Sequence, residues 1–477
     1  MKIKVEQLIK ILLIFAALLP LQLTLRTVLH FPSYLLLIYI FIFIGGVFVC
    51  FFRKKLHSIS KFQASVLIIL LIFFCEMLIS VLYNYPDIID KKVHFEYYVS
   101  KYSSFWDSAL MSSLFAGIIR PIVYFTFSYI LLKLIQTEKQ LKLLCKSLIL
   151  LGFISSLYSI YQIIAYKFGL PFSALFSGHS DGIIEVFGVR RCEGLFYEPG
   201  PQASYLSVVF SLMLFYLMFK YKNLKKIYGK LSLFFVFFTI TVALFLTLSP
   251  IGILTPIISI LFLSCTKWNT FSKYTKIAII AIPLVILLVF GNIKIGENSN
   301  SLSNYLIDRI YALKINNDNF NGESRSVRNE VGTKIIKDHM WLGVGPGNDG
   351  FYYSQYAPFA LGRFPDKGIV LNNNLKILSD SGILGFICYI FILLYPAYFY
   401  YFKKKLNLVN NNNFIDYLIE ALFLSEFLLV VLTFNSQVEF FQPLFWLTYS
   451  MLISAISIKL RNTKAKIELI KRIKYCE

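Results

Sequence analysis

A succession of apolar runs, most of them long enough to cross a lipid bilayer as a helix, constrains what this chain can fold into. About twelve such runs are present, and roughly 20 apolar residues in a helix span the hydrocarbon core. Hydrophobic residues make up 57% of the 477 residues, more than soluble domains usually contain. We therefore predict an all-α polytopic membrane protein. The runs are 7–28, 33–52, 62–83, 113–136, 143–166, 203–220, 231–248, 251–266, 276–293, 383–402, 417–435 and 442–460.

Basic residues occupy every second connection between the runs. Lys and Arg are retained on the cytoplasmic side of a membrane protein, so seven basic segments on one side fit twelve spans with both termini inside. We predict an integral, multi-pass protein of the cytoplasmic (inner) membrane, without a cleavable signal peptide. The segments contain Lys2 and Lys4, Arg53 to Lys55, Lys139 to Lys146, Lys220 to Lys226, Lys267 and Lys273, Lys403 to Lys405, and Lys459 to Arg472.

The formal net charge of +21 has two interpretations, positive-inside topology with attraction to anionic lipid or nucleic-acid binding. The Lys and Arg residues sit mostly in short clusters between apolar runs. No zinc or RNA-binding motif accompanies them. We therefore expect membrane lipid, and no nucleic acid, among the partners.

The same topology predicts three regions. Residues 1–293 form a membrane domain of helices 1–9 that includes an arginine-containing outer loop, 167–202. Residues 294–381 form one large extracytoplasmic loop between helices 9 and 10. Residues 382–477 contain helices 10–12 and a basic cytoplasmic tail. Polar and charged residues thus gather on the outer face, where we expect an anionic ligand to bind.

The shorter outer loop places two adjacent arginines, Arg190 and Arg191, next to Glu193 and Glu198. A guanidinium group matches phosphate geometry through forked hydrogen bonds, so the loop is suited to an anionic ligand. The alternative is a solvated charged turn with internal ion pairs.

The larger loop contains a predicted amphipathic helix, Ser324 to Asp338. Arg325 and Arg328 are three residues apart and share a face of that helix. The glycine run 341–348 follows it; no Gly-Lys-Ser/Thr comes after, so it is not a P-loop. A tight turn accounts for these glycines.

Charged residues also occur inside the predicted spans. Arg120 lies within the fourth run, where a charge usually faces protein or a polar cavity. Glu76 is one possible ion-pair partner of Arg120. For Glu420 and Glu426, the alternative ion-pair partners are an arginine and a lysine near a helix end.

Three stretches, taken in order on this topology, resemble the O-antigen ligase and polymerase superfamily. Residues 191–206 resemble its Arg…Gly-x-Phe…Pro…Ala-x-Tyr-Leu element. Residues 325–348 resemble its arginine helix followed by Gly-Val-Gly-Pro-Gly-Asn. Residues 372–385 resemble the Asn-x-x-Leu-x-x-Leu-x-acidic-Ser/Thr-Gly-x-x-Gly element that enters the next span.

The chain departs from the family pattern at two places. The family often has His immediately before the Asn of the last element, and ligases in particular rely on it; this chain has Leu371. The family also often has Ser-Arg at the outer end of a mid-chain span, and here the pair is Ser249-Pro250. The missing histidine favours a polymerase, most like the O-antigen (surface polysaccharide repeat-unit) polymerases.

The resemblance implies a metal-independent membrane glycosyltransferase of the GT-C type, with about 12 transmembrane helices and no cofactor. Its substrate would be an undecaprenyl-pyrophosphate-linked oligosaccharide at the outer leaflet, as in O-antigen (lipopolysaccharide) or capsule synthesis. The glycan chain would move from one carrier to another lipid-linked repeat. A chain-length regulator protein is a further expected partner.

The chemistry requires cations at the leaving diphosphate, because charge develops there as the sugar–phosphate bond breaks. We assign Arg191 and Arg328 as catalytic residues and Glu198 as the general base; its alternative role is an ion pair that orients Arg191. The expected substrate-binding residues are Arg190, Arg325, Arg120 and Asn372, the last with loop support as its alternative role.

Two rival functions remain open. A ligase of the same superfamily would transfer finished glycan to an acceptor. A flippase for the lipid-linked oligosaccharide would also fit twelve spans, although exporters generally carry their polar residues within the spans.

Overall fold

A computed structural model describes most of the chain as a helical bundle with one short hairpin. Predicted run 276–293, and run 33–52 apart from residues 45 and 46, lie outside the described residues. The described residues are 2–18, 20, 45–46, 59–89, 119–171, 185–186, 189–196, 198–223, 227–266, 325–356, 370, 372–402, 414–432 and 442–476.

Helices account for nearly all of the regular structure in these ranges, as predicted. Each of the ten remaining apolar runs contains a helix. The helices are α1 (Lys2–Leu18), α4 (Lys61–Ile88), α7 (Arg120–Leu134), α8 (Glu138–Phe168), α9 (Pro199–Asn223), α10 (Ile227–Leu246), α11 (Pro250–Thr266), α14 (Arg325–Asp338), α15 (Asp349–Tyr356), α16 (Asn373–Phe402), α17 (Phe414–Phe427) and α18 (Pro443–Cys476), with the π-helix η7 (Leu428–Leu432) directly after α17.

Five of the described helices are long and apolar enough to cross a membrane. They are α4, α8, α9, α16 and α18, and α7, α10 and α11 provide shorter apolar segments. A chain with this many apolar helices is a polytopic membrane protein.

Local signals in the sequence explain where two of the long helices begin. The Ser60 side chain accepts a hydrogen bond from the backbone N–H of Gln63, whose own side chain reaches back to the backbone of Ser60. Thr137 and Gln140 form the same reciprocal capping box before α8. Each box satisfies backbone donors that a helix start leaves unpaired.

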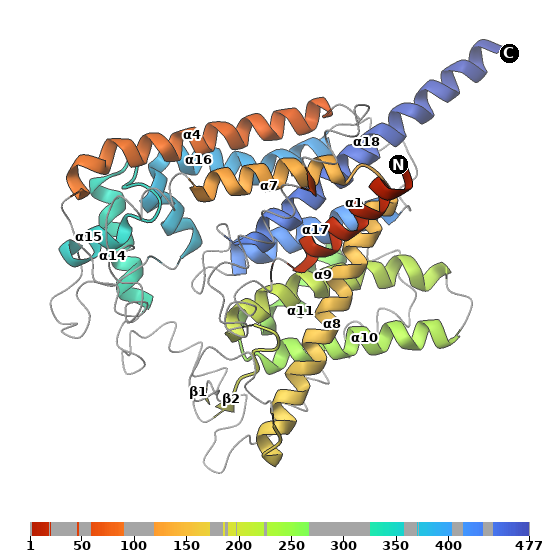
Figure 1. Ribbon diagram of the computed structural model, residues 1–477, viewed down its shortest axis with the longest axis horizontal. Coiled ribbons are helices and arrows are strands. Elements are labelled where there is room, and N and C mark those ends of the chain that lie inside the picture. Colours follow the sequence, from red (N-terminus) through yellow and green to blue (C-terminus); the bar gives the residue numbers. More distant parts are fainter. Residues whose placement is uncertain are drawn as a thin grey trace.

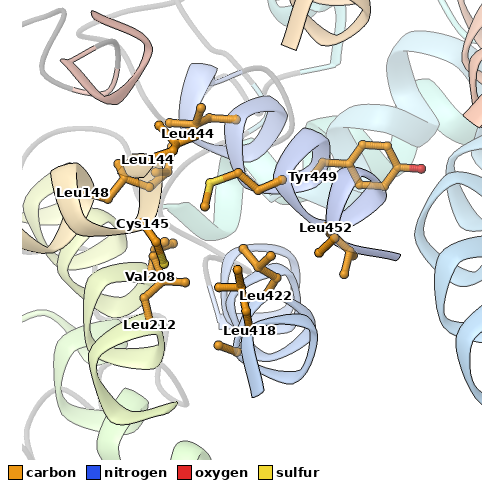
Figure 2. Packing of buried hydrophobic residues seen from close by; sticks show 14 of the residues in the cluster. Leu144, Cys145, Leu148, Val208, Leu212, Leu418, Leu422, Leu444, Tyr449 and Leu452 are labelled. Atoms are coloured by element: carbon orange, nitrogen blue, oxygen red, sulfur yellow. The ribbon is translucent and has the colours of Figure 1, made fainter. Parts of the chain in front are cut away.

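The core lies between α8, α9, α17 and α18. The central apolar windows of α9 and α18 are 89% and 94% buried, whereas those of α4 and α16 are 44% buried. The first two helices are therefore central and the other two peripheral, with a face left for lipid. Figure 2 shows side chains from four helices converging: Leu144 and Leu148, Val208 and Leu212, Leu418 and Leu422, and Leu444 and Leu452.

The two ends of the bundle differ. In Figure 1, α14 and α15 lie at one end beside the start of α16, and both chain termini lie toward the other end. This arrangement agrees with termini on one side and the large loop on the opposite side. Which side faces the cytoplasm stays a prediction.

Candidate active site

The third family-like stretch forms a sharply bent helix. At Gly382 the backbone leaves the helical conformation, with φ 61° and ψ −164°. The side-chain amide of Asn373 donates to the hydroxyl of Tyr389, 16 residues later, at 2.9 Å. In a straight helix these residues would stand roughly 24 Å apart along the axis. Residues 373–381 are therefore a half-helix that folds back against the rest of α16.

The glycine run of the second stretch is seated on this bend. The backbone N–H groups of Val344 and Gly345 donate to the carbonyl oxygens of Ser379 and Asp380, both at 2.8 Å. Gly343, Gly345 and Gly347 all have positive φ, which glycine alone adopts without strain. A side chain at Gly343 would meet the backbone of Asp380. The run is the tight turn that the sequence predicts, and the turn holds the half-helix.

A buried ion cluster fixes the half-helix to α15. Lys376 Nζ lies 2.6 Å from Asp349 Oδ1 and 2.9 Å from Asp380 Oδ1. The second oxygen of Asp349 accepts a hydrogen bond from the backbone N–H of Val370 at 2.9 Å. All three charged side chains are at most 8% exposed. This cluster was not predicted; its only local sign in the sequence is the four-residue spacing of Lys376 and Asp380.

Helix α4 supports the bend from the other side. Ser80 Oγ donates to the Asp380 carbonyl at 3.0 Å, and the Asn84 amide donates to the Gly343 carbonyl at 2.9 Å. The carboxyl of buried Glu76 lies against Gly385 of α16. The proposed pairing of Glu76 with Arg120 cannot be followed, because the Arg120 side chain lies outside the described residues.

Arg328 lies on the buried face of α14. The predicted helix 324–338 is confirmed as Arg325–Asp338. Val331 and Ile335 are fully buried, and Gly332 is in close contact with Val370. These positions follow Arg328 by three, seven and four residues, so all share its face. Arg328 itself is half-buried.

Arg191 is held at the turn between α10 and α11. Its Nε donates to the Thr247 carbonyl at 2.9 Å, and the next backbone N–H, of Cys192, donates to the Leu246 carbonyl at 3.1 Å. Arg191 thus lies beside the Ser249–Pro250 start of α11, the place where the resembled family often carries an arginine. In this chain the arginine beside that place is Arg191, which belongs to the outer loop before α9.

Arg190 belongs to a two-stranded hairpin that precedes this turn. Strands β1 (Glu185–Val186) and β2 (Val189–Arg190) are antiparallel, with Glu185 opposite Arg190. The side chain of Arg190 lies outside the described residues, as does that of Arg325, the first residue of α14.

A polar stripe on α8 holds the loop that follows Arg191. Gln162 Oε1 accepts the backbone N–H groups of Glu193 and Gly194 at 3.1 and 2.8 Å. Ser155 Oγ accepts the N–H of Leu195 at 3.1 Å and donates to Gln202 Oε1 at 2.9 Å. This polar stripe was not predicted. Its signal is the spacing of Ser155, Ser159 and Gln162 within an apolar run, which puts all three on one helix face.

The remaining predicted residues lie at helix starts. Glu198 is half-buried immediately before α9, where a negative charge suits the helix dipole. Asn372 is buried, and its side-chain oxygen accepts the N–H groups of Asn374 and Leu375 at 3.0 and 3.1 Å. This capping contact fits the supporting role considered for Asn372. Arg120 is the first residue of α7.

The structure therefore builds two arginine positions on different elements. Arg191 is placed by α8 and the α10–α11 turn, and Arg328 by the packing of α14 on the bent helix. Burial also raises the pKa of the Cys192 thiol to about 12, so at neutral pH this thiol stays protonated and is a poor nucleophile. Within the described ranges, no three His, Cys, Asp or Glu side chains are grouped to hold a metal ion.

Comparison with known proteins agrees with this architecture. The family described as O-antigen ligase matches residues 234–390, a segment that includes Arg328, the glycine run and the bend of α16. No curated protein matches the chain. Members of the family include O-antigen polymerases and O-antigen ligases and act on lipid-linked glycans in surface polysaccharide biosynthesis. Residues 234–390 of this membrane protein are thus a domain of the O-antigen ligase family.

Proposed function

We propose that the protein is a polymerase of lipid-linked oligosaccharide repeat units. It transfers the glycan chain from undecaprenyl pyrophosphate to another lipid-linked repeat at the outer leaflet, in the synthesis of O-antigen or capsule. The observation that carries the choice of polymerase over ligase is Leu371, directly before the capping residue Asn372. A ligase of this family would be expected to have histidine at that place.

Arg191 and Arg328, which the protein holds in place, are suited to bind the diphosphate of the donor. In this reaction an acceptor hydroxyl attacks the anomeric carbon and the sugar–diphosphate bond breaks. Arg191 and Arg328 are both positioned by hydrogen bonds or packing before any substrate arrives. Preorganised cations stabilise developing negative charge well where water is limited. Arg190, Arg325 and Arg120 supply further positive charge in this proposal, and Asn372 lies beside the substrate while capping the half-helix.

Glu198 is the general base proposed from the sequence. It follows Arg191 by seven residues on the same loop. Its alternative role is to orient Arg191. The two roles differ in kinetics: loss of a base lowers turnover, whereas loss of an orienting charge also weakens donor binding.

The proposed site lies on the outer face of the cytoplasmic membrane. It requires about twelve spans, cytoplasmic termini and a GT-C-like arrangement. In Figure 1, α14, α15 and the start of α16 lie together at one end of the bundle, which supports a large loop on one side of the membrane. A metal-independent reaction and a partner that regulates chain length are further parts of the proposal.

A gel of surface glycan from a deletion strain tests the function. The deletion should collapse the ladder to core plus one repeat, and the wild-type gene should restore it. A gene carrying Arg328→Ala should not restore it although the protein is present. An intact polymer held on the carrier lipid would instead indicate a ligase. Single repeats accumulating on the inner face would indicate an exporter.

A further inference from the structure

A carboxyl group on α17 is buried in the membrane domain, and only one of its oxygens has a hydrogen-bond partner in the described part of the chain. Glu426 is 7% exposed. Its Oε1 accepts a hydrogen bond from Thr448 Oγ1 of α18 at 2.5 Å. Its Oε2 has no hydrogen-bond partner among the described residues. An unsatisfied acidic oxygen inside a membrane is costly, and such groups commonly mark a functional site.

The polar groups around Glu426 include a residue of the bent helix α16. Glu426 lies within electrostatic range of the hydroxyls of Tyr389 and Tyr449. Tyr389 accepts the amide of Asn373, so the half-helix that follows Leu371 reaches this cluster directly. Carboxylate, phenol and amide groups together are suited to the hydroxyl groups of a sugar, because each donates or accepts hydrogen bonds.

The cluster lies toward the end of the bundle that carries α14 and α15. At about 1.5 Å per residue, Thr448 stands about 8 Å along α18 from Pro443, and Tyr389 about 9 Å along α16 from Ile383. Both helices have these ends toward α14 and α15 (Figure 1). The carboxyl is therefore in the half of the membrane domain nearest the large loop.

The neighbouring π-helix connects Glu426 to the helices beside Arg191. η7 begins two residues after Glu426 and packs against α9 and α11, the helices that follow Glu198 and the Arg191 contact. Tyr389, on the other side, belongs to the helix on which α14 packs. Short π-helical segments occur frequently at functional sites.

We propose that Glu426 is the catalytic base of this enzyme, which rests on the proposed polymerase function. The acceptor hydroxyl gives its proton to Glu426 Oε2, and its oxygen forms the new bond to the anomeric carbon. The bond from that carbon to the diphosphate breaks, and its electron pair leaves with the diphosphate. Thr448 holds Oε1, while Tyr389 and Asn373 orient the sugar. Glu198 then has the orienting role at Arg191.

Kinetics of the full-length protein in lipid nanodiscs test the assignment. The substrate is the lipid-linked repeat extracted from the deletion strain, and elongation is followed on gels. Glu426→Gln keeps the size of the side chain and an acceptor for Thr448. We expect turnover to fall roughly 100- to 10,000-fold, the usual contribution of a general base, with KM changed by less than about threefold.

Glu420→Gln is the matched control, because Glu420 is a buried carboxyl on the same helix, nearer its opposite end. It should keep wild-type turnover. Full turnover in Glu426→Gln, or a rise in KM alone, would overturn the assignment, as would loss of turnover confined to Glu198→Gln. If wild-type protein elongates nothing, the polymerase function itself is wrong; with an active wild type, only Glu426 is at stake.

Tyr389→Phe keeps the test decisive if Glu426→Gln does not accumulate. It removes one hydroxyl and leaves the ring. We expect about a tenfold loss of turnover at normal abundance, the value of one well-placed hydrogen bond in the transition state. Unchanged turnover would count against the cluster as part of the active site.

Discussion

Asp349 and Lys376, on different helices, form an ion pair of 2.6 Å in which the side chains are 3% and 8% exposed. Asp349 starts α15 and Lys376 lies one turn into the half-helix of α16. Because the same lysine also binds Asp380 of its own half-helix, one cation neutralises two buried carboxylates and fixes α15 to the half-helix.

Lys376→Met should therefore destabilise the protein strongly. It leaves two buried carboxylates without their cation, and breaking such a pair from one side costs about 3–5 kcal/mol. Thermal unfolding in detergent measures the change. Lys334→Met is the matched control, because Lys334 pairs with Glu330 at the surface, where both side chains are at least 41% exposed; it should cost less than about 1 kcal/mol. Equal effects of the two substitutions would contradict the structural role of Lys376.

Gly382→Ala should abolish the bend of α16. The residue has φ 61°, and an added Cβ would meet the backbone of Trp341. We expect a loss of more than about 3 kcal/mol, because strain and overlap combine. Gly169→Ala has a similar φ of 64° but no atom within 4 Å of the added Cβ, so strain alone should cost about 1–2 kcal/mol. Thermal unfolding compares the two variants. A smaller loss of stability in Gly382→Ala than in Gly169→Ala would contradict the close packing of the glycine turn on the bend of α16.

Arg191→Lys should be nearly as inactive as Arg191→Ala. The Nε donor to Thr247 and the planar guanidinium are lost in lysine although the charge remains. Chain length on a gel of surface glycan is the measurement, with protein abundance checked by immunoblot. Wild-type ladders from Arg191→Lys would mean that charge alone is needed.

Gln162→Leu should weaken the site through the loop and leave Arg191 itself intact. Two backbone N–H groups, of Glu193 and Gly194, lose their acceptor, which costs about 1–3 kcal/mol when the groups are buried. We expect shorter glycan and a higher KM for the lipid-linked repeat. Gln162→Glu keeps an acceptor oxygen and should restore part of the activity. Identical behaviour of the two variants would argue against the hydrogen bonds.

Thiol labelling tests both burial and orientation. Cys192 is 1% exposed, and its pKa is raised to about 12 by burial, so it stays protonated below that pH and should not react at pH 8. Met340→Cys, at a position 43% exposed beside α14, should react with a membrane-impermeant maleimide in intact spheroplasts. If that cysteine reacts only after lysis, the large loop is cytoplasmic and the proposed topology is reversed.

The membrane helices, the helix 325–338 and the glycine turn after it could be predicted, because their sequence signals are local. Hydropathy marks a span without reference to its neighbours, and the periodicity of 325–338 marks an amphipathic helix. The glycine run was expected to be a turn because few other structures need so many glycines.

The side-chain contacts that hold the site could not be predicted, because they join residues that are distant in the sequence. Lys376 binds a residue 27 positions earlier, and nothing near either residue indicates the pairing. Glu426 was expected to meet an arginine or a helix-end lysine; instead Thr448 binds it. Lys459, a lysine near the end of the last predicted span, pairs with Asp416 at 2.5 Å. Side-chain partners across a bundle depend on helix rotation, which hydropathy leaves open.

The glycine turn seated on the bend has a consequence for genetics. The residues that make this domain recognisable in sequence, from the glycine run to Asp380 and Gly382, are occupied with holding one another. A mutational scan scored by growth or serotype would mark them as essential for this structural role, whether or not they also contact substrate. Only variants that accumulate normally and still fail to elongate glycan would separate chemistry from architecture in this enzyme.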